Sequence, residues 1–159
     1  MNSKPTADRP VMPDGYGVPE TTEGILSWES VRERLEQAKH FWVCTASPKG
    51  RPHATPLWGA WVDDNFYFDG ALTTRWGRNL SANPFVEIHL ESGSEVVIIE
   101  GTFSQTNDLT PEAFERVQAS YKTRYESYQP ETREQLYQVR PQKALVWTKF
   151  PTDVTRFRF

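Results

Sequence analysis

The sequence is poor in the residues that bind metals and form disulfides. It has one cysteine, Cys44, and three histidines that lie far apart in the chain, His40, His53 and His89. A single cysteine excludes an intramolecular disulfide and a thiolate metal cluster, and no H-E-x-x-H or similarly close ligand pattern is present. We therefore predict no metal site, and we interpret Cys44, within the apolar run FWVCTA, as a small buried hydrophobe.

The chain also lacks the signatures of several large classes of protein. Its formal net charge of −3 gives no basic excess, which argues against a nucleic-acid partner. No segment is apolar for long enough to cross a bilayer, and the N-terminus has no apolar leader, so we expect no membrane partner and a cytoplasmic location. The G-x-G-x-x-G, P-loop and G-x-S-x-G motifs are all absent.

The composition is that of one globular domain preceded by an arm. Apolar residues make up 37% of the 159 residues and charged residues 25%, which suits a single domain with a real core. Residues 1–24 hold four of the twelve prolines and three of the nine glycines. We therefore predict an extended N-terminal arm without regular structure over residues 1–24 and a single folded domain over residues 25–159. The arm is either disordered or partly ordered by packing of the MPDGYG stretch, through Tyr16, over a neighbouring subunit or site.

Local patterns within residues 25–159 predict a mostly antiparallel sheet with helices around it. A helix begins after Ser27, a hairpin joins 41–47 to 51–62, and a second helix begins at Thr110-Pro111 with an aromatic stripe that extends to Tyr128. We expect a β-meander from 41 to 106, a short helical piece at 130–138, and strands at 143–150 and 154–159. Pro52 and Pro56 place the second arm of the hairpin at a sheet edge or bulge.

The stretch from Asn65 to Glu91 is the most informative. It predicts a strand, a turn, a short helix capped by Thr74, and a second strand. Arg75 in the first turn opposes the helix dipole, and Arg78 lies on the same face. Two readings follow: the arginines bind an anion, or they form surface ion pairs with Asp63, Asp64 or Asp69.

The run RPHATPLWGAWVDDNFYFDGALTTRWGRNLSANPFVEIHLESGSEVVIIEGT resembles the core of the pyridoxamine 5′-phosphate oxidase-like superfamily of flavin-binding split barrels. It is similar in particular to the branch that uses FMN or the deazaflavin coenzyme F-420. The resemblance covers residues 28–106 well and YQVRPQKALVW more loosely. It implies an α+β fold, a six-stranded antiparallel split β-barrel with peripheral helices, and a homodimer with two cofactor sites at the subunit interface.

The resemblance also implies which residues hold the cofactor. The strand at 53–58 would run along the isoalloxazine ring largely through its backbone, the start of the short helix would hold the ribityl phosphate, and the end of the strand at 66–68 would lie under the ribityl chain or ring edge. The implied cofactor-binding residues are His53, Ala54, Thr55, Pro56, Leu57, Trp58, Phe68, Asp69, Thr73, Thr74, Arg75 and Arg78. Many relatives have a lysine or arginine where this chain has Trp76.

Three functions follow from these observations. The first is an FMN- or F-420-dependent oxidoreductase that transfers hydride to or from an unidentified small molecule; we assign no catalytic acid or base. The second is a non-enzymatic split barrel that binds or sequesters flavin or haem. The third is a structural dimer with an empty site, in which Arg75 and Arg78 pair with carboxylates.

Overall fold

A computed structural model of the chain describes residues 4–106 and 108–159, and it has an α+β fold. The α-helices are α1 (Trp28–Gln37), α2 (Arg75–Ala82) and α3 (Pro111–Arg124), with 3-10 turns η1 (Asp14–Tyr16) and η2 (Arg133–Gln135). The strands are β1 (Thr6–Asp8), β2 (Phe41–Ala46), β3 (Pro52–Leu57), β4 (Ala60–Val62), β5 (Asn65–Asp69), β6 (Phe85–His89), β7 (Val96–Gln105), β8 (Leu136–Trp147) and β9 (Thr155–Arg158).

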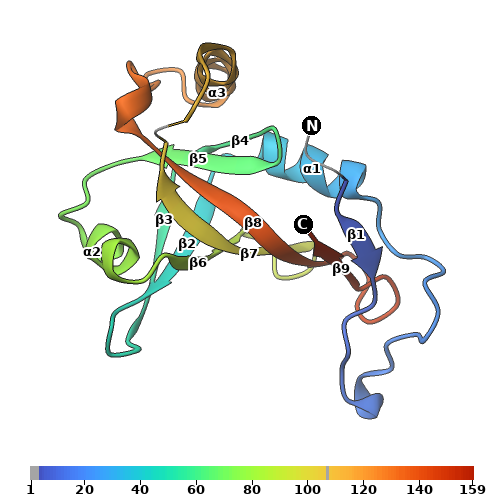
Figure 1. Cartoon of the computed structure of the whole chain (residues 1–159). Coiled ribbons are helices and arrows are strands. Elements are labelled where there is room, and N and C mark those ends of the chain that lie inside the picture. The colour runs from blue at the N-terminus through green and yellow to red at the C-terminus, as the bar shows by residue number, and fades with distance from the viewer. Residues whose placement is uncertain (1–3, 107) are drawn as a thin grey trace.

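All strand pairs in the described residues are antiparallel, and the sheet curls without closing. The order β1-β9-β8-β7-β6-β2-β3 is extended by β5, which pairs with β8, and by β4, which pairs with β5. The curled sheet therefore has β3 at one end and β4 at the other, with no ladder between them (Figure 1). This is the expected split barrel, and it has nine strands because short strands β1, β4 and β9 extend the barrel sheet.

Strand β8 organises the barrel because it is the longest strand and has three partners. One of its edges pairs with β7 along its length, and its other edge is shared by β5 in the first half and β9 in the second. The register between β7 and β8 shifts at Glu100 and Gly101, and such a bulge bends a strand pair. The predicted strand at 143–150 thus begins earlier, at Leu136, and only residues 133–135 of the predicted helical piece are helical.

The predicted meander from 41 to 106 is wrong in its strand order. A meander would pair each strand with the next along the chain, whereas β2 pairs with β6 and β5 pairs with β8. The strand order departs from a meander because α2 lies between β5 and β6. The chain passes through α2 across the open side of the barrel, and β6 then pairs with β2 (Figure 1).

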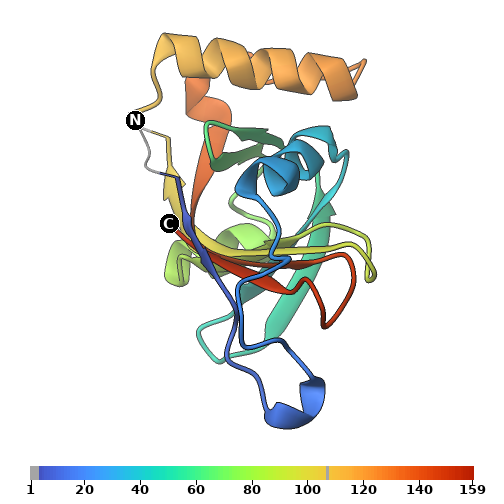
Figure 2. The ribbon, with the colours of Figure 1, turned by 90° about the vertical axis from the view of Figure 1, so that its right-hand side faces the viewer.

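The predicted helices form where their caps are. Ser27, Thr74 and Thr110 are the N-cap residues, and each side-chain oxygen accepts a hydrogen bond from the third residue that follows. α3 lies across one end of the molecule, beyond α1 and β4 (Figure 2). It ends at Arg124, so Tyr128 lies beyond the helix, and only the part of the predicted stripe up to Tyr125 packs as core.

Two clusters form the core. The larger fills the barrel with aliphatic and aromatic side chains from α1, α2 and the strands, among them Trp28, Leu35, Trp61 and Ile88, all buried. The smaller lies between α3 and the sheet and includes Tyr67, Val117 and Tyr121. In the part of the chain that the structure describes, no helix is long and apolar enough to cross a membrane.

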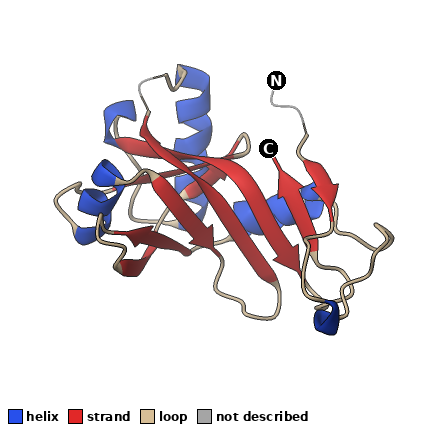
Figure 3. Cartoon of the chain, turned by 60° about the horizontal axis from the view of Figure 1, so that its bottom comes forward, coloured by secondary structure: helices blue, strands red, loops and turns tan. Residues whose placement is uncertain are grey.

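The N-terminal arm has more structure than the sequence predicts. Residues 6–8 form β1, which pairs with β9, and residues 14–16 form η1 (Figure 3). Arg9 donates to the main-chain oxygens of Thr21 at 3.0 Å and Thr152 at 2.8 Å. The expectation of no regular structure is therefore wrong for residues 6–8, where the distant strand β9 supplies the partner. It is also wrong for residues 14–16, where the Tyr16 N–H donates to the nearby Pro13 carbonyl at 3.0 Å. Residues 1–3 lie outside the described residues.

Candidate functional site

A groove lies between the β2–β3 turn and the outer face of α2. Its volume is about 560 Å³. It is lined by four cationic side chains and by small or polar residues of the same two segments: Lys49, Arg51, Arg75, Arg78, Ser47, Pro48, Asn79 and Ala82. We call this the basic groove. It contains both arginines that the sequence singled out, and it adds two cations from the turn.

Local sequence positions both walls of the basic groove. In the turn, Gly50 adopts a φ of 74°, a conformation that glycine takes without steric cost, and its N–H donates to the Ser47 carbonyl at 2.8 Å. In the other wall, Asn79 is buried and its Nδ2 donates to Thr45 Oγ1 at 2.9 Å. This bond fixes α2 against β2.

Close packing also sets the position of α2. A Cβ added at Gly77 would lie 2.4 Å from the Cα of Leu72, so only glycine allows the helix to approach its own preceding loop. On the inner side Trp76 is buried, with its ring 5.3 Å from that of Phe68 and 6.1 Å from that of Tyr137. The position where many relatives carry a cation therefore belongs to the core in this chain.

Neither Arg75 nor Arg78 has a carboxylate partner among the described residues. Arg75 donates to the carbonyl of Pro52 at 3.4 Å, and Arg78 donates to the carbonyl of Thr73. These weak or local contacts leave both guanidinium groups exposed at the groove.

The three acids considered as their partners are engaged elsewhere. Asp63 pairs with Arg116 at 2.5 Å, Asp64 accepts from Trp28 Nε1 at 2.9 Å, and Asp69 accepts from two tyrosines. The alternative of surface ion pairs is therefore not what the structure shows. Unpaired cations around a groove are the arrangement that a phosphate group requires.

Strand β3 leads away from the basic groove as an open edge. Within residues 4–106 and 108–159 its one partner is β2, as the prolines predict. The Ser47 N–H donates to the Arg51 carbonyl and Arg75 donates to the Pro52 carbonyl, so the backbone of residues 51, 53, 55 and 57 faces β2 and that of 52, 54 and 56 faces outward. The outward edge presents three carbonyls and one N–H, that of Ala54, since proline has none.

The side chains of β3 divide by the same alternation. Ala54 and Pro56 are exposed, whereas His53, Thr55 and Leu57 are half-buried. Leu57 packs against the main core. A cofactor ring could therefore reach β3 through the side chains of Ala54 and Pro56 and through the outward-facing backbone.

Beyond the end of β3, aromatic residues surround Asp69. Trp58 is 42% exposed, and its ring stacks on Tyr125 with centroids 4.6 Å apart. The hydroxyls of Tyr121 and Tyr128 donate to the two oxygens of Asp69, the first at 3.4 Å. Burial and the bond to Asp69 raise the pKa of Tyr128 to about 12, and burial raises the pKa of Tyr121 well above its usual value. Both tyrosines are therefore neutral donors at pH 7.

The structure does not bring all predicted site residues to the surface. Phe68 is fully buried and packs on Phe66, Trp76, Phe103 and Tyr137. The alternation of β5 turns this side chain into the barrel. Thr74 uses its hydroxyl within the fold, where it accepts from the Gly77 N–H at 3.2 Å and donates to the Ala71 carbonyl at 2.8 Å.

Sequence reasoning missed Lys49, Arg51 and Tyr128 as site residues. The two cations stand in the turn signal SPKGR, but only the position of α2 brings them beside Arg75. Tyr128 stands at helical spacing from Tyr121, yet the chain leaves the helix before it and returns its hydroxyl to Asp69. Cys44 is half-buried, and burial and the charge of Glu87 raise the pKa of its thiol.

Comparison with solved structures places the fold among known split barrels. An F-420 reductase aligns with a TM-score of 0.53 and 21% identity, over 75% of this chain and 96% of that one. A haem storage protein from Vibrio cholerae aligns with a TM-score of 0.56 and 18% identity, over 75% and 93%. An FAD-binding protein from Mesorhizobium loti aligns with a TM-score of 0.59 and 17% identity, over 84% and 95%.

Comparison by sequence gives the family. Among curated proteins, none matches the chain. The family model described as pyridoxamine 5′-phosphate oxidase matches residues 27–148, a range that runs from the N-cap of α1 to the end of β8 and includes the basic groove and the open edge of β3. The chain therefore belongs to the pyridoxamine 5′-phosphate oxidase family.

Proposed function

We propose that the protein is an oxidoreductase that uses FMN or the deazaflavin coenzyme F-420 and transfers hydride to or from a small molecule. The observation that supports this most is the basic groove, whose four cations have no carboxylate partner in residues 4–106 and 108–159. A phosphate-bearing tail would be held there by Arg75, Arg78, Arg51 and Lys49 through charge-assisted hydrogen bonds. The bound cofactor would supply the hydride chemistry.

The open edge of β3 would orient the ring. In this proposal the Ala54 N–H and the outward carbonyls of Pro52, Ala54 and Pro56 meet the polar rim of the ring, and the small exposed side chains of Ala54 and Pro56 allow a flat molecule to approach. An edge rich in carbonyls favours a ligand that carries N–H donors, and the pyrimidine end of both flavin and deazaflavin carries one.

The aromatic residues around Asp69 would bound the far end of the site. Trp58 offers an exposed, stacked face on which a planar substrate can lie. Tyr128 holds a proton at Oη throughout the physiological range and fixes the orientation of the Asp69 carboxylate. We assign these two residues to substrate orientation.

We also propose a homodimer with the cofactor sites at its interface and a cytoplasmic location. A single chain leaves the groove and the β3 edge open on one side. A second copy would supply the missing wall and exclude water from the ring. Sedimentation equilibrium with and without cofactor tests this, and a monomer under both conditions would contradict it.

Cofactor titration followed by fluorescence tests the central proposal. We expect saturable binding of FMN or F-420, and we expect Arg75→Ala and Arg78→Ala each to weaken it by about 1–3 kcal/mol. Arg32→Ala is the matched control, because Arg32 is an arginine of α1 whose side chain is 42% exposed and has a surface partner, Glu36. Absence of binding of both cofactors at tens of micromolar would end the proposal.

A second candidate function is storage or sequestration of a flavin or haem without catalysis. The aromatic surface formed by Trp58 and Tyr128 supports it, as does the fold shared with a haem storage protein. Anaerobic reduction separates the two functions. An oxidoreductase should cycle between reduced and oxidised cofactor with an electron donor and acceptor, whereas a storage protein should release or retain its ligand unchanged.

A further inference from the structure

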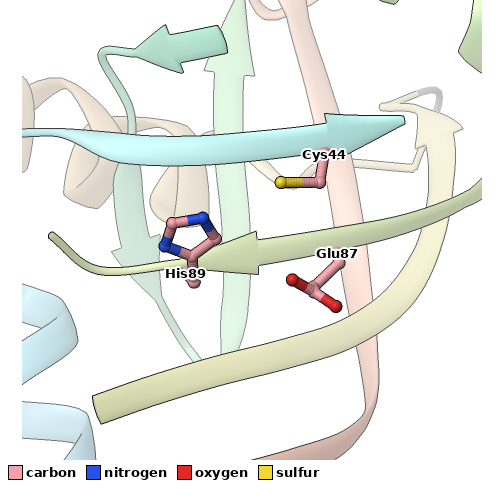
Figure 4. A group of neighbouring side chains, drawn as sticks. All are labelled: Cys44, Glu87 and His89. Atoms are coloured by element: carbon pink, nitrogen blue, oxygen red, sulfur yellow. The ribbon is translucent and has the colours of Figure 1, made fainter. Parts of the chain in front are cut away.

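The outer face of the sheet brings together three metal-ligating side chains that are remote in sequence. Cys44 on β2 stands opposite Glu87 on β6, and His89 follows Glu87 by two residues and therefore lies on the same face. Figure 4 shows the three side chains converging on one space in front of the two strands, with a ring nitrogen of His89 turned toward Cys44. The strand pairing that places them side by side depends on tertiary structure, so it does not follow from their spacing along the chain.

Their ligand atoms are close enough for one ion. One atom from each residue lies within 4.8 Å of the other two. Ligands around a zinc ion stand about 2.0–2.3 Å from it, so adjustments of side-chain torsion bring all three to bonding distance. All three residues are half-buried, and a bound ion would be partly shielded from water.

The histidine is prepared for coordination. The Nδ1 of His89 lies 2.8 Å from the carbonyl of Leu90, and because a carbonyl only accepts, Nδ1 carries the proton. The lone pair is then on Nε2. A backbone carbonyl in this role is the usual outer partner of a metal-ligating histidine, where it fixes both tautomer and ring orientation.

Neighbouring groups hold the cluster in place and do not compete for it. The Trp42 ring stacks on the His89 ring at an interplanar angle of 9°. Glu100, which stands opposite Glu87 on the other side of β6, is paired with Lys143 at 2.7 Å. The acid nearest in the next strand is therefore already neutralised by a lysine.

We propose that Cys44, Glu87 and His89 form a binding site for a divalent transition-metal ion of the zinc class. A sulfur, an imidazole nitrogen and a carboxylate oxygen together favour such an ion over magnesium or calcium, which take oxygen ligands. The thiolate and the carboxylate would balance its two positive charges. Three protein ligands leave a fourth position for water or another small ligand, as in sites with an open coordination position.

The site stands apart from the basic groove and does not depend on the proposed cofactor. Its ligands are on β2 and β6, whereas the groove is formed by the β2–β3 turn and α2. The two proposals can therefore be tested independently. A protein that binds no metal could still bind the cofactor, and a protein that binds no cofactor could still bind the metal.

The first experiment uses the wild-type protein and its single thiol. Because Cys44 is the only cysteine, the rate of its reaction with a thiol reagent reports on this site alone. We expect one equivalent of Zn²⁺ to slow that reaction at least tenfold and a chelator to restore it, whereas Mg²⁺ should have no effect. An unchanged rate in the presence of excess Zn²⁺ would overturn the proposal.

The second experiment identifies the ligands with Co²⁺ as a spectroscopic probe. We expect stoichiometric binding with a sulfur-to-metal charge-transfer band that Zn²⁺ abolishes by displacement. Cys44→Ser should remove the band, and His89→Gln and Glu87→Gln should each weaken binding at least tenfold. Glu33→Gln, on the exposed face of α1, and His40→Gln are the controls and should bind as the wild type does.

Circular dichroism of every variant establishes that it is folded, so that lost binding can be assigned to lost ligands. A charge-transfer band that survives in Cys44→Ser would overturn the proposal. So would equal weakening in the control variants, because the ion would then bind to surface charge in general.

Discussion

Two groups of arginines on this molecule have opposite surroundings. At the β1–β9 margin, Arg156 binds both oxygens of Asp8 at 2.8 and 2.9 Å, and Arg158 binds the same carboxylate at 2.8 Å. At the basic groove, Arg75 and Arg78 donate to main-chain carbonyls, have no carboxylate partner among the described residues, and are exposed to solvent.

The difference separates a structural use of arginine from a binding use. A guanidinium that already holds a carboxylate has its charge and its planar set of donors occupied, and here it joins the N-terminal arm to the barrel. A guanidinium that makes only weak hydrogen bonds to carbonyls still has its positive charge and most of its donors available for a ligand. The sequence alone does not separate these groups, since each contains arginines near acidic residues and only the pairing in space decides their use.

The largest expected effect comes from Gly77→Ala, which would displace α2 and so disrupt one wall of the basic groove. The new Cβ would collide with the backbone of Leu72, at 2.4 Å, and we expect a loss of about 3 kcal/mol in the free energy of unfolding. Cofactor binding should fall as well, because Arg75 and Arg78 move with the helix. Chemical denaturation measures the first effect.

Gly93→Ala is the control for this substitution, because a Cβ at Gly93 meets nothing within 4 Å. Unchanged stability in Gly77→Ala would show that α2 is not fixed by its contact with Leu72.

An intermediate effect is expected when one arginine of each group is replaced by alanine and the two variants are compared. Arg156→Ala should lower the free energy of unfolding by about 1 kcal/mol, because it removes two hydrogen bonds to Asp8, and should leave cofactor affinity unchanged. Arg78→Ala should do the reverse, weakening cofactor binding with little change in stability. Thermal unfolding and cofactor titration on both variants measure this. If both variants lose stability, or if both lose cofactor affinity, the distinction between structural and ligand-binding arginines is contradicted.

The smallest effect concerns pH at the β1–β9 margin. The hydrogen bond from Arg156, with the charges of Arg156 and Arg158, holds the pKa of Asp8 below its usual value of 3.8. A carboxyl whose pKa is lowered by folding stabilises the protein above its unfolded pKa and loses that contribution as the pH falls through its folded pKa. Asp8 is 36% exposed, so solvent screening limits the contribution to less than about 1 kcal/mol.

Comparison of Asp8→Asn with the wild type across pH tests this sign. The wild type should be the more stable at pH 7. The difference should begin to shrink below a pH of about 4 and should close once the pH has fallen through the folded pKa of Asp8, which lies below 3.8. A gap that widens as the pH falls would contradict the assignment.

Sequence patterns predict the local elements of this fold well. Ser27, Thr74 and Thr110 mark the helix starts, and the prolines of β3 mark the sheet edge. These succeed because capping oxygens and missing N–H groups act on residues a few positions away. The placement of Trp76 and Leu80 toward the core follows from helical spacing for the same reason.

Long-range pairings are what the sequence does not predict. The arm residues 6–8 form a strand only because β9 offers an edge, and the pairing of β2 with β6 follows from the path of the chain through α2. The candidate site shows the same limit. Arg75 and Arg78 are predictable from one helix, but Lys49 and Arg51 join them only in the fold, and the burial of Phe68 depends on which face of β5 the barrel encloses.

The outward edge of β3 has a further consequence for the behaviour of the protein at high concentration. An exposed strand edge is a template on which strands of other molecules can add, which leads to aggregation. A strand that adds needs alternating donors and acceptors, and this edge offers a single N–H, at Ala54, because Pro52 and Pro56 occupy the other outward positions. The same two prolines that keep the edge open to a small ligand thus make it a poor seed for fibrils.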